Sequence, residues 1–214
     1  MFSVKLDALQ NLDGRKIQIK DSIVYLGALV SIDGNVESEI SRRIGMAQQD
    51  FRNLSRIWNK ISISKRRKLE LLSACVFSTL TYGLQTIWLH KHHRKKLNGF
   101  QCRCLRSVLR IRASFVSRVS NKEVLRRSGY VALSNLILEQ QLRLFGKYAR
   151  DNDSSGRRFL FSDNGIELRP FIDKRVRGRP RLTWARKIYN YTLMMKTTTM
   201  PGVSIKDFII QRDK

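Results

Sequence analysis

The sequence predicts a mainly α-helical protein, in which an N-terminal β-hairpin is followed by a helical bundle and an irregular basic tail. Three observations support this fold class. Two β-branched runs at 17–19 and 23–30 flank a polar tripeptide, and an Asp-Gly turn follows at 33–34. From about 35 to 150, apolar residues recur at helical spacing instead. Beyond that range the chain becomes polar, basic and rich in turn-forming residues.

The same changes in composition divide the chain into four segments. Residues 1–34 hold the hairpin, 35–150 the helical bundle, 151–170 a linker, and 171–214 a basic tail with a short helix from Thr183. A lone two-stranded hairpin does not bury enough surface to be stable in water. We therefore expect the hairpin to be the edge of a larger sheet.

Two long helices are expected at the start of the bundle. Asn35 is the expected N-cap of the first, which carries acidic residues in its first turn, where the helix dipole favours them. Its apolar face consists of Ile40, Ile44, Ala47, Phe51, Leu54 and Ile57. Ser64 is expected to begin the second helix, and Tyr82-Gly83 marks its break or kink.

Three more helices follow in the bundle. One runs from about His90 to Ile111, with an apolar face at helical spacing. Ser120 and Glu123 form a capping-box pattern for a short helix that Gly129 can close. Ser134 is the expected cap of the last helix of the bundle.

Charge is the most informative feature of the composition. The 214 residues include 42 Lys and Arg against 17 Asp and Glu, a net charge of +25, most of it between residues 36 and 150. Such a field favours polyanions, and nucleic acid is the commonest one, with an anionic membrane surface as the alternative. Because the sequence shows neither a long apolar run nor a secretory signal, we expect an intracellular, nuclear or cytoplasmic protein without a membrane partner.

Two groups of basic residues are candidates for phosphate contact. Arg103, Arg106 and Arg110 recur three and four residues apart, which places them on one stripe of the expected helix beside its apolar face. Guanidinium groups match phosphate geometry, although a solvated helix flank is the alternative. Lys65 and Arg66 belong to a run of four cations at a helix start, which could instead form a solubilising first turn.

A third basic group lies in the tail. Arg177 and Arg179 flank a glycine and precede a proline, the letters of an AT-hook core whose arginines enter a narrow minor groove. Such short patterns arise easily in basic proteins. General phosphate contact and a structural segment packed on the bundle through Leu182 and Trp184 remain the alternatives.

The sequence offers no catalytic centre of its own. Carboxylates are few and scattered, with no Asp-Asp pair, and neither a nucleophile triad nor a Gly-rich phosphate loop is present. Cys102 and Cys104, downstream of three histidines, could indicate zinc, but residues two apart on a helix point in nearly opposite directions. We therefore expect no catalytic residue, no metal and no cofactor in this chain.

Six phrases of the sequence, in their order along the chain, resemble the C-terminal part of reverse transcriptases from non-LTR, LINE-like retrotransposons. The resemblance covers about residues 15 to 187. The phrases are "YLGALVSIDGNVESEISRRIGMAQQDF", "SISKRRKLELLSACVFSTLTYG", "LNGFQCRCLRSVLRI", "RVSNKEVLRRSG", "QQLRLFGKYAR" and "RGRPRLTW".

This resemblance implies an RNA-directed DNA polymerase as the parent family. Tyr25, Leu26 and Gly27 match the primer-grip hairpin that closes the palm, and the following helices match the thumb and post-thumb that clasp the template-primer duplex. The implied partner is thus an RNA–DNA hybrid or duplex, with a ribonucleoprotein containing the element's RNA as a further expectation. Fingers and palm are expected upstream in a full element, and magnesium is implied only for that palm.

The chain also departs from the family. The catalytic Ala/Tyr-x-Asp-Asp phrase and any endonuclease domain are absent, Gly146-Lys147 stands where many relatives have Gly-His, and the C-terminal Cys/His knuckle of some lineages is lacking. We therefore expect this chain alone to be inactive as a polymerase. Two alternatives remain: a domesticated basic helical module with a structural or packaging role, and an enzyme assembled with a palm from another chain.

Overall fold

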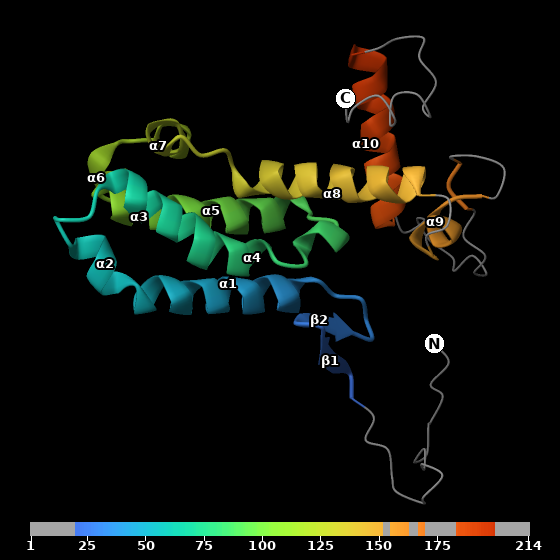
Figure 1. Cartoon of the computed structure of the whole chain (residues 1–214), viewed down its shortest axis with the longest axis horizontal. Coiled ribbons are helices and arrows are strands. Elements are labelled where there is room, and N and C mark those ends of the chain that lie inside the picture. Colours follow the sequence, from blue (N-terminus) through green and yellow to red (C-terminus); the bar gives the residue numbers. More distant parts are fainter. Residues whose placement is uncertain (1–19, 152–154, 163–166, 170–182, 200–214) are drawn as a thin grey trace, which may run out of the picture. The chain divides into compact units, whose positions relative to one another are not determined.

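The computed structural model describes residues 20–151, 155–162, 167–169 and 183–199. The chain divides into two compact units, Met1–Arg42 and Arg43–Lys214. The division falls inside the first helix, α1 (Glu37–Asn53), whereas the sequence analysis placed a boundary after residue 34. The fold class is as predicted, since an antiparallel two-stranded hairpin precedes a mainly helical structure (Figure 1).

The hairpin forms within a single apolar run. Strands β1 (Ser22–Tyr25) and β2 (Ala28–Ser31) pair in antiparallel register, with Tyr25 opposite Ala28. Leu26 and Gly27 form the two-residue turn, and both have positive φ, 46° and 77°, as turns that match the twist of a hairpin require. The predicted placement of the strands was therefore wrong. The run 23–30 folds back on itself at Leu26-Gly27, and residues 17–19 lie outside the described ranges.

Two charged residues of α1 fasten this turn. The Glu39 carboxylate accepts a hydrogen bond from the Leu29 N–H at 3.0 Å. The Arg42 guanidinium donates to Glu39 at 2.7 Å and to the Gly27 carbonyl at 2.6 Å. The bond to Glu39 also raises the pKa of Arg42. The hairpin is thus held to the first turns of α1 by charge-assisted hydrogen bonds.

The helical unit begins with the rest of α1, which ends earlier than predicted. The chain turns at Leu54, and α2 (Ser55–Asn59) follows as a separate short helix. Trp58 stacks on Phe51 with ring centroids 5.3 Å apart and donates its indole N–H to the Phe51 carbonyl. This contact packs α2 back onto the end of α1.

The second predicted helix is confirmed, although it is not regular throughout. It consists of α3 (Lys65–Leu71), a π-helical segment η1 (Leu72–Phe77) and α4 (Ser78–Thr81) in direct succession. The Ser64 hydroxyl accepts the Arg67 N–H at 3.3 Å, as expected of its N-cap. Gly83, with φ 76°, ends the segment before the short 3₁₀ helix η2 (Leu84–Thr86).

The longest helix, α5 (Lys91–Leu109), packs against three others: α3, α7 (Asn121–Ser128) and α8 (Leu133–Arg150) (Figure 1). A short helix, α6 (Ser114–Ser117), lies between α5 and α7. The predicted capping of α7 is confirmed, because Ser120 accepts the Glu123 N–H and Gly129 takes positive φ. The apolar face of α5 lies in the core, with Leu97, Phe100, Cys104, Leu105 and Val108 buried.

The cap of α8 differs from the prediction. The helix begins at Leu133, so Ser134 lies inside it. Two side chains of α5 bind its first N–H groups instead. The buried Gln101 accepts from Leu133, and Asn98 accepts from Ser134, each at 3.0 Å. These bonds fix the start of α8 against the middle of α5.

The C-terminal helices form a second apolar cluster. Phe161, which follows α9 (Ser155–Leu160), packs with Phe145 of α8 and Ile188 of α10 (Trp184–Thr199). The range 151–170, expected to be a linker, therefore contributes a helix and a core residue. Thr183 accepts the Arg186 N–H and begins α10, as predicted, and α10 is a longer helix than expected.

Candidate nucleic-acid interface

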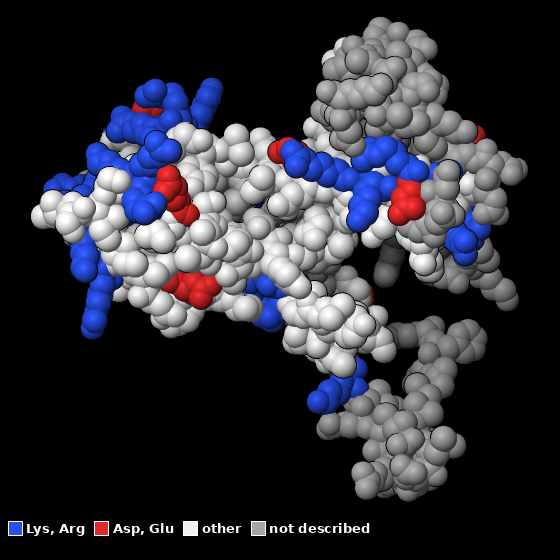
Figure 2. Space-filling model, in the orientation of Figure 1, with Lys and Arg blue, Asp and Glu red and all other residues white. Residues whose placement is uncertain are grey.

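Exposed cations from several segments gather at the end of the helical unit where α2 ends, α3 begins and α5 ends. Figure 1 shows these helix ends together with α6 and α7, and Figure 2 shows the Lys and Arg side chains over them. We call this surface the basic end. It comprises Lys60, Lys65, Arg66, Arg67, Arg110, Arg112, Arg118 and Lys122, all exposed.

Hydrogen bonds to the last carbonyls of α2 bring these segments together. Lys68 of α3 is only 4% exposed, and its ammonium donates to the carbonyls of Trp58 and Lys60 at 2.9 and 2.5 Å. Arg110, at the end of α5, donates to the Asn59 carbonyl at 3.3 Å. A helix C-terminus favours cations because its last carbonyls lack partners. The structure thus places Arg110 on the same surface as Lys65 and Arg66.

Arg106 is not part of this surface. Its side chain is 7% exposed, and its guanidinium donates to the carbonyls of Arg112 and Val119 at 3.5 and 2.8 Å and to the Asn121 amide oxygen at 2.9 Å. The prediction that Arg106 meets phosphate is therefore wrong. The sequence places it at the edge of the apolar face, and the chain after α5 folds back over that edge.

Arg103 is exposed on α5, seven residues before Arg110, or about 10 Å along the helix. Its guanidinium lies 5.9 Å from the ring centroid of Phe100. The predicted stripe of three arginines is thus reduced to two exposed side chains, with a buried one between them.

Acidic residues neutralise only part of the charge of the basic end. Glu70 pairs with both Arg66 and Arg67, at 3.1 and 3.6 Å, in exposed contacts. On α7, Arg126 and Arg127 bind Glu123 and lower the pKa of its carboxyl to about 2. Exposed ion pairs of this kind are weak, so a polyanion can compete for these arginines.

The other predicted site residues lie elsewhere. Tyr25, Leu26 and Gly27 form the end of β1 and the turn of the hairpin, in the N-terminal unit, with the Tyr25 and Leu26 side chains exposed. Arg177 and Arg179 lie outside the described residues.

Sequence reasoning missed the contribution of residues 112–119, which we call the α6 loop. Arg112, Phe115 and Arg118 are all exposed there. The segment lacks helical periodicity, which is why it yielded no candidate. The alternation of arginines with an aromatic residue was the signal that could have found it.

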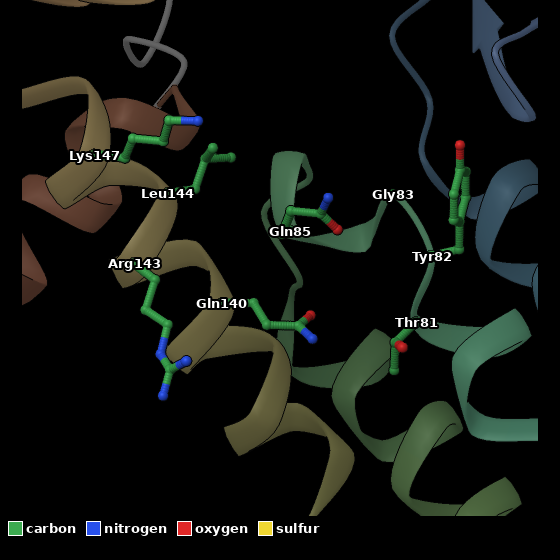
Figure 3. Close-up of a pocket in the computed structure, with 8 residues that line it drawn as sticks. All are labelled: Thr81, Tyr82, Gly83, Gln85, Gln140, Arg143, Leu144 and Lys147. Carbon is green, nitrogen blue, oxygen red and sulfur yellow. The ribbon is translucent and has the colours of Figure 1, made fainter. Parts of the chain in front are cut away.

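A pocket of about 440 Å³ lies on another part of the helical unit, between α8 and the turn after α4 (Figure 3). Gln85 comes from η2, after the turn, and Gln140, Arg143 and Lys147 come from α8 (Figure 3). Arg143 pairs with Glu139 at 2.7 Å. The residues lining the pocket are Thr81, Tyr82, Gly83, Gln85, Gln140, Arg143, Leu144 and Lys147. They include no acid, histidine or cysteine, so we assign no catalytic role to this pocket.

The cysteines are thiols in two environments. Cys102 and Cys104 are buried in α5, and burial raises the pKa of both thiols, that of Cys104 to about 12. Cys75 is exposed. In the described part of the chain, neither Cys102 nor Cys104 belongs to a cluster of three or more potential metal ligands.

Fold and surface together define a basic, mainly helical protein, with exposed cations gathered at the basic end and a further group of cations elsewhere on the surface (Figure 2). No model of a protein family matches the chain, and neither a curated protein nor a solved structure matches it. In the described ranges, no helix has the length and apolar character needed to cross a bilayer.

Proposed function

We propose that this chain binds the phosphate backbone of an RNA–DNA hybrid or duplex through its basic end, as the primer-grip, thumb and post-thumb part of a non-LTR retrotransposon reverse transcriptase. One observation carries the binding proposal: eight exposed cations from separate segments form one surface on a scaffold of packed helices. Each cation that contacts a phosphate releases a counterion, so such a surface binds nucleic acid with little regard to sequence.

The hairpin supports the assignment to a polymerase rather than to a domesticated helical module. Ile23, Val24, Leu26 and Val30 are exposed although they are apolar. Exposed apolar residues on a two-stranded sheet are typical of a surface that is covered in a larger assembly. A palm would supply that cover, whereas a module that acts alone has no need for it.

A variant with fewer charges at the basic end tests the proposal. Lys65→Gln, Arg66→Gln and Arg110→Gln together remove three exposed cations and leave the buried Arg106 and Lys68 in place. Binding to a duplex is measured by fluorescence anisotropy over a range of salt concentrations. Because the slope of log K against log salt is about 0.9 per phosphate contact, we expect it to fall by roughly 2 to 3.

The matched control removes three exposed lysines from the opposite end of α5 and from the end of α8: Lys91→Gln, Lys95→Gln and Lys147→Gln. It lowers the net charge by the same amount, so the general field of the protein weakens equally. We expect the control to keep most of the parent slope. Equal slopes for the two variants would refute the basic end as the binding surface.

A further inference from the structure

Phe115 lies in α6, and 79% of its surface is exposed. Its neighbour Val116 is also exposed, and Arg112 and Arg118 flank the pair on either side. Single exposed apolar residues are common on protein surfaces. Here, however, the aromatic ring lies among the cations of the basic end.

Hydrogen bonds join the two ends of the loop that carries Phe115. The buried Arg106 guanidinium binds the Arg112 carbonyl before α6 and the Val119 carbonyl after it, at 3.5 and 2.8 Å. The Ser117 hydroxyl also donates to the Arg112 carbonyl, at 3.0 Å. A buried side chain therefore joins the residues before and after α6, the helix that carries the Phe115 ring.

Two arginines of the basic end have positive φ, a backbone conformation that favours glycine. Arg110 ends α5 with φ 56°, and Arg118 ends α6 with φ 55°. Helix ends of this kind usually carry glycine, because other residues are strained at positive φ, by roughly 1 kcal/mol. Both side chains are exposed. Residues held in sparsely populated backbone conformations cluster at active sites and ligand-binding segments.

We propose that Phe115 stacks on an unpaired nucleobase of a nucleic acid whose phosphates lie on the basic end. This inference rests on the proposed function and adds the kind of substrate: a duplex with an unpaired base, such as a bulge or a junction with a single strand. A ring cannot stack inside an intact duplex without the cost of unstacking its base pairs, whereas an unpaired base offers a free face.

The surroundings of Phe115 favour a base over a lipid. The aromatic ring supplies a stacking surface that accepts any base, and the flanking guanidinium groups suit the adjacent phosphates. Peripheral membrane binding usually relies on a continuous apolar face of an amphipathic helix. The four residues of α6 carry only two large apolar side chains, Phe115 and Val116.

The experiment compares two probes of equal length, a fully paired duplex and the same duplex with one bulged 2-aminopurine. Phe115→Ala should weaken binding to the bulged probe about 5- to 150-fold, the range for loss of one base–aromatic stack. Affinity for the paired duplex should stay within twofold. Phe115→Leu keeps an apolar side chain but not the stack, so it should behave like Phe115→Ala, whereas Phe115→Trp should retain binding and quench the 2-aminopurine.

Phe159→Ala is the matched control, since Phe159 is 87% exposed, follows Arg158 and lies on α9. It should leave both affinities unchanged. The inference is overturned if Phe115→Ala binds the two probes as the parent does, or if Phe115→Leu retains full affinity for the bulge. Binding to vesicles with 30% phosphatidylserine that depends on Phe115, without a preference for the bulge, would assign the loop to membranes instead.

The two proposals fail in distinguishable ways. A parent protein that binds neither probe overturns the proposed function, and this inference with it. A parent that binds both probes equally, with a normal salt slope and no effect of Phe115, overturns the inference alone.

Discussion

The guanidinium of Arg106 joins the two ends of the α6 loop, whereas Arg110, four residues later, extends from the surface. Both arginines share the same side of α5 in the sequence pattern. Their roles differ because the chain after α5 covers one and not the other. A buried guanidinium must be bound by several acceptors, and the carbonyls of Arg112 and Val119 provide them.

Arg106→Gln should therefore destabilise the protein. The shorter amide cannot reach the same acceptors, and the loss of charge-assisted bonds to buried groups costs about 2–3 kcal/mol. Unfolding in urea measures the change in free energy. Arg103→Gln, on an exposed residue of the same helix, should change it by less than about 0.5 kcal/mol. Similar stabilities for the two variants would contradict the internal role of Arg106.

The cysteines should differ in reactivity. The thiolate is the reactive form, and the pKa of Cys104, raised to about 12 by burial, keeps this thiol protonated at pH 8. Cys75 is exposed and should be labelled first by a maleimide. Mass spectrometry of the folded protein should find one labelled site, and all three after denaturation. Rapid labelling of Cys104 in the folded protein would count against the packing of α5.

At the scale of elements, the hairpin and the α3–α4 segment differ in what supports them. All four residues of β1 are exposed, and β1 and β2 form a two-stranded sheet of their own. Leu72, Val76 and Leu80 are fully buried. Local stability follows such burial, because opening a poorly packed element exposes little apolar surface.

Hydrogen exchange should therefore be faster in β1 and β2 than in residues 66–80. Amides of the hairpin should exchange by local opening, while those of the helical segment should exchange near the rate set by global unfolding. Mass spectrometry of peptic fragments resolves the two regions. Equal protection would contradict the view that the hairpin is less well packed than the helical segment.

The helix ends that were predicted correctly are set by residues close to them in the sequence. Ser64, Ser120 and Gly129 cap helices through bonds within a few residues of themselves. The start of α8 could not be predicted in this way, because its caps are Asn98 and Gln101, more than 30 residues away. The hairpin was expected, but its turn was misplaced, since the positive φ of Leu26 is unusual for that residue.

The cations of the candidate site could be predicted from the sequence, whereas the hydrogen bonds that bring them together could not. Lys65, Arg66 and Arg110 stand out by charge alone, and they prove to share one surface. The contribution of Lys68 to that surface is indirect, through its bonds to the end of α2. Such bonds join segments that are distant in the sequence, so no local pattern reveals them.

At the scale of the whole molecule, the excess of positive charge is concentrated in residues 36–150, which carry +18 of the total +25. A polymerase needs clustered carboxylates to hold magnesium ions, and the sequence has no Asp-Asp pair. The chain alone should therefore not extend a primed RNA template with magnesium or manganese. Extension above a control without protein, dependent on the template, would overturn this expectation.

Lysine footprinting tests most directly which surface meets nucleic acid. The protein is acetylated with and without a saturating RNA–DNA hybrid, and modification is quantified at each lysine by mass spectrometry. Lys60, Lys65 and Lys122 of the basic end should be protected, while Lys91, Lys95 and Lys147 should react as in the free protein. Protection of the second group with free reaction of the first would contradict the account.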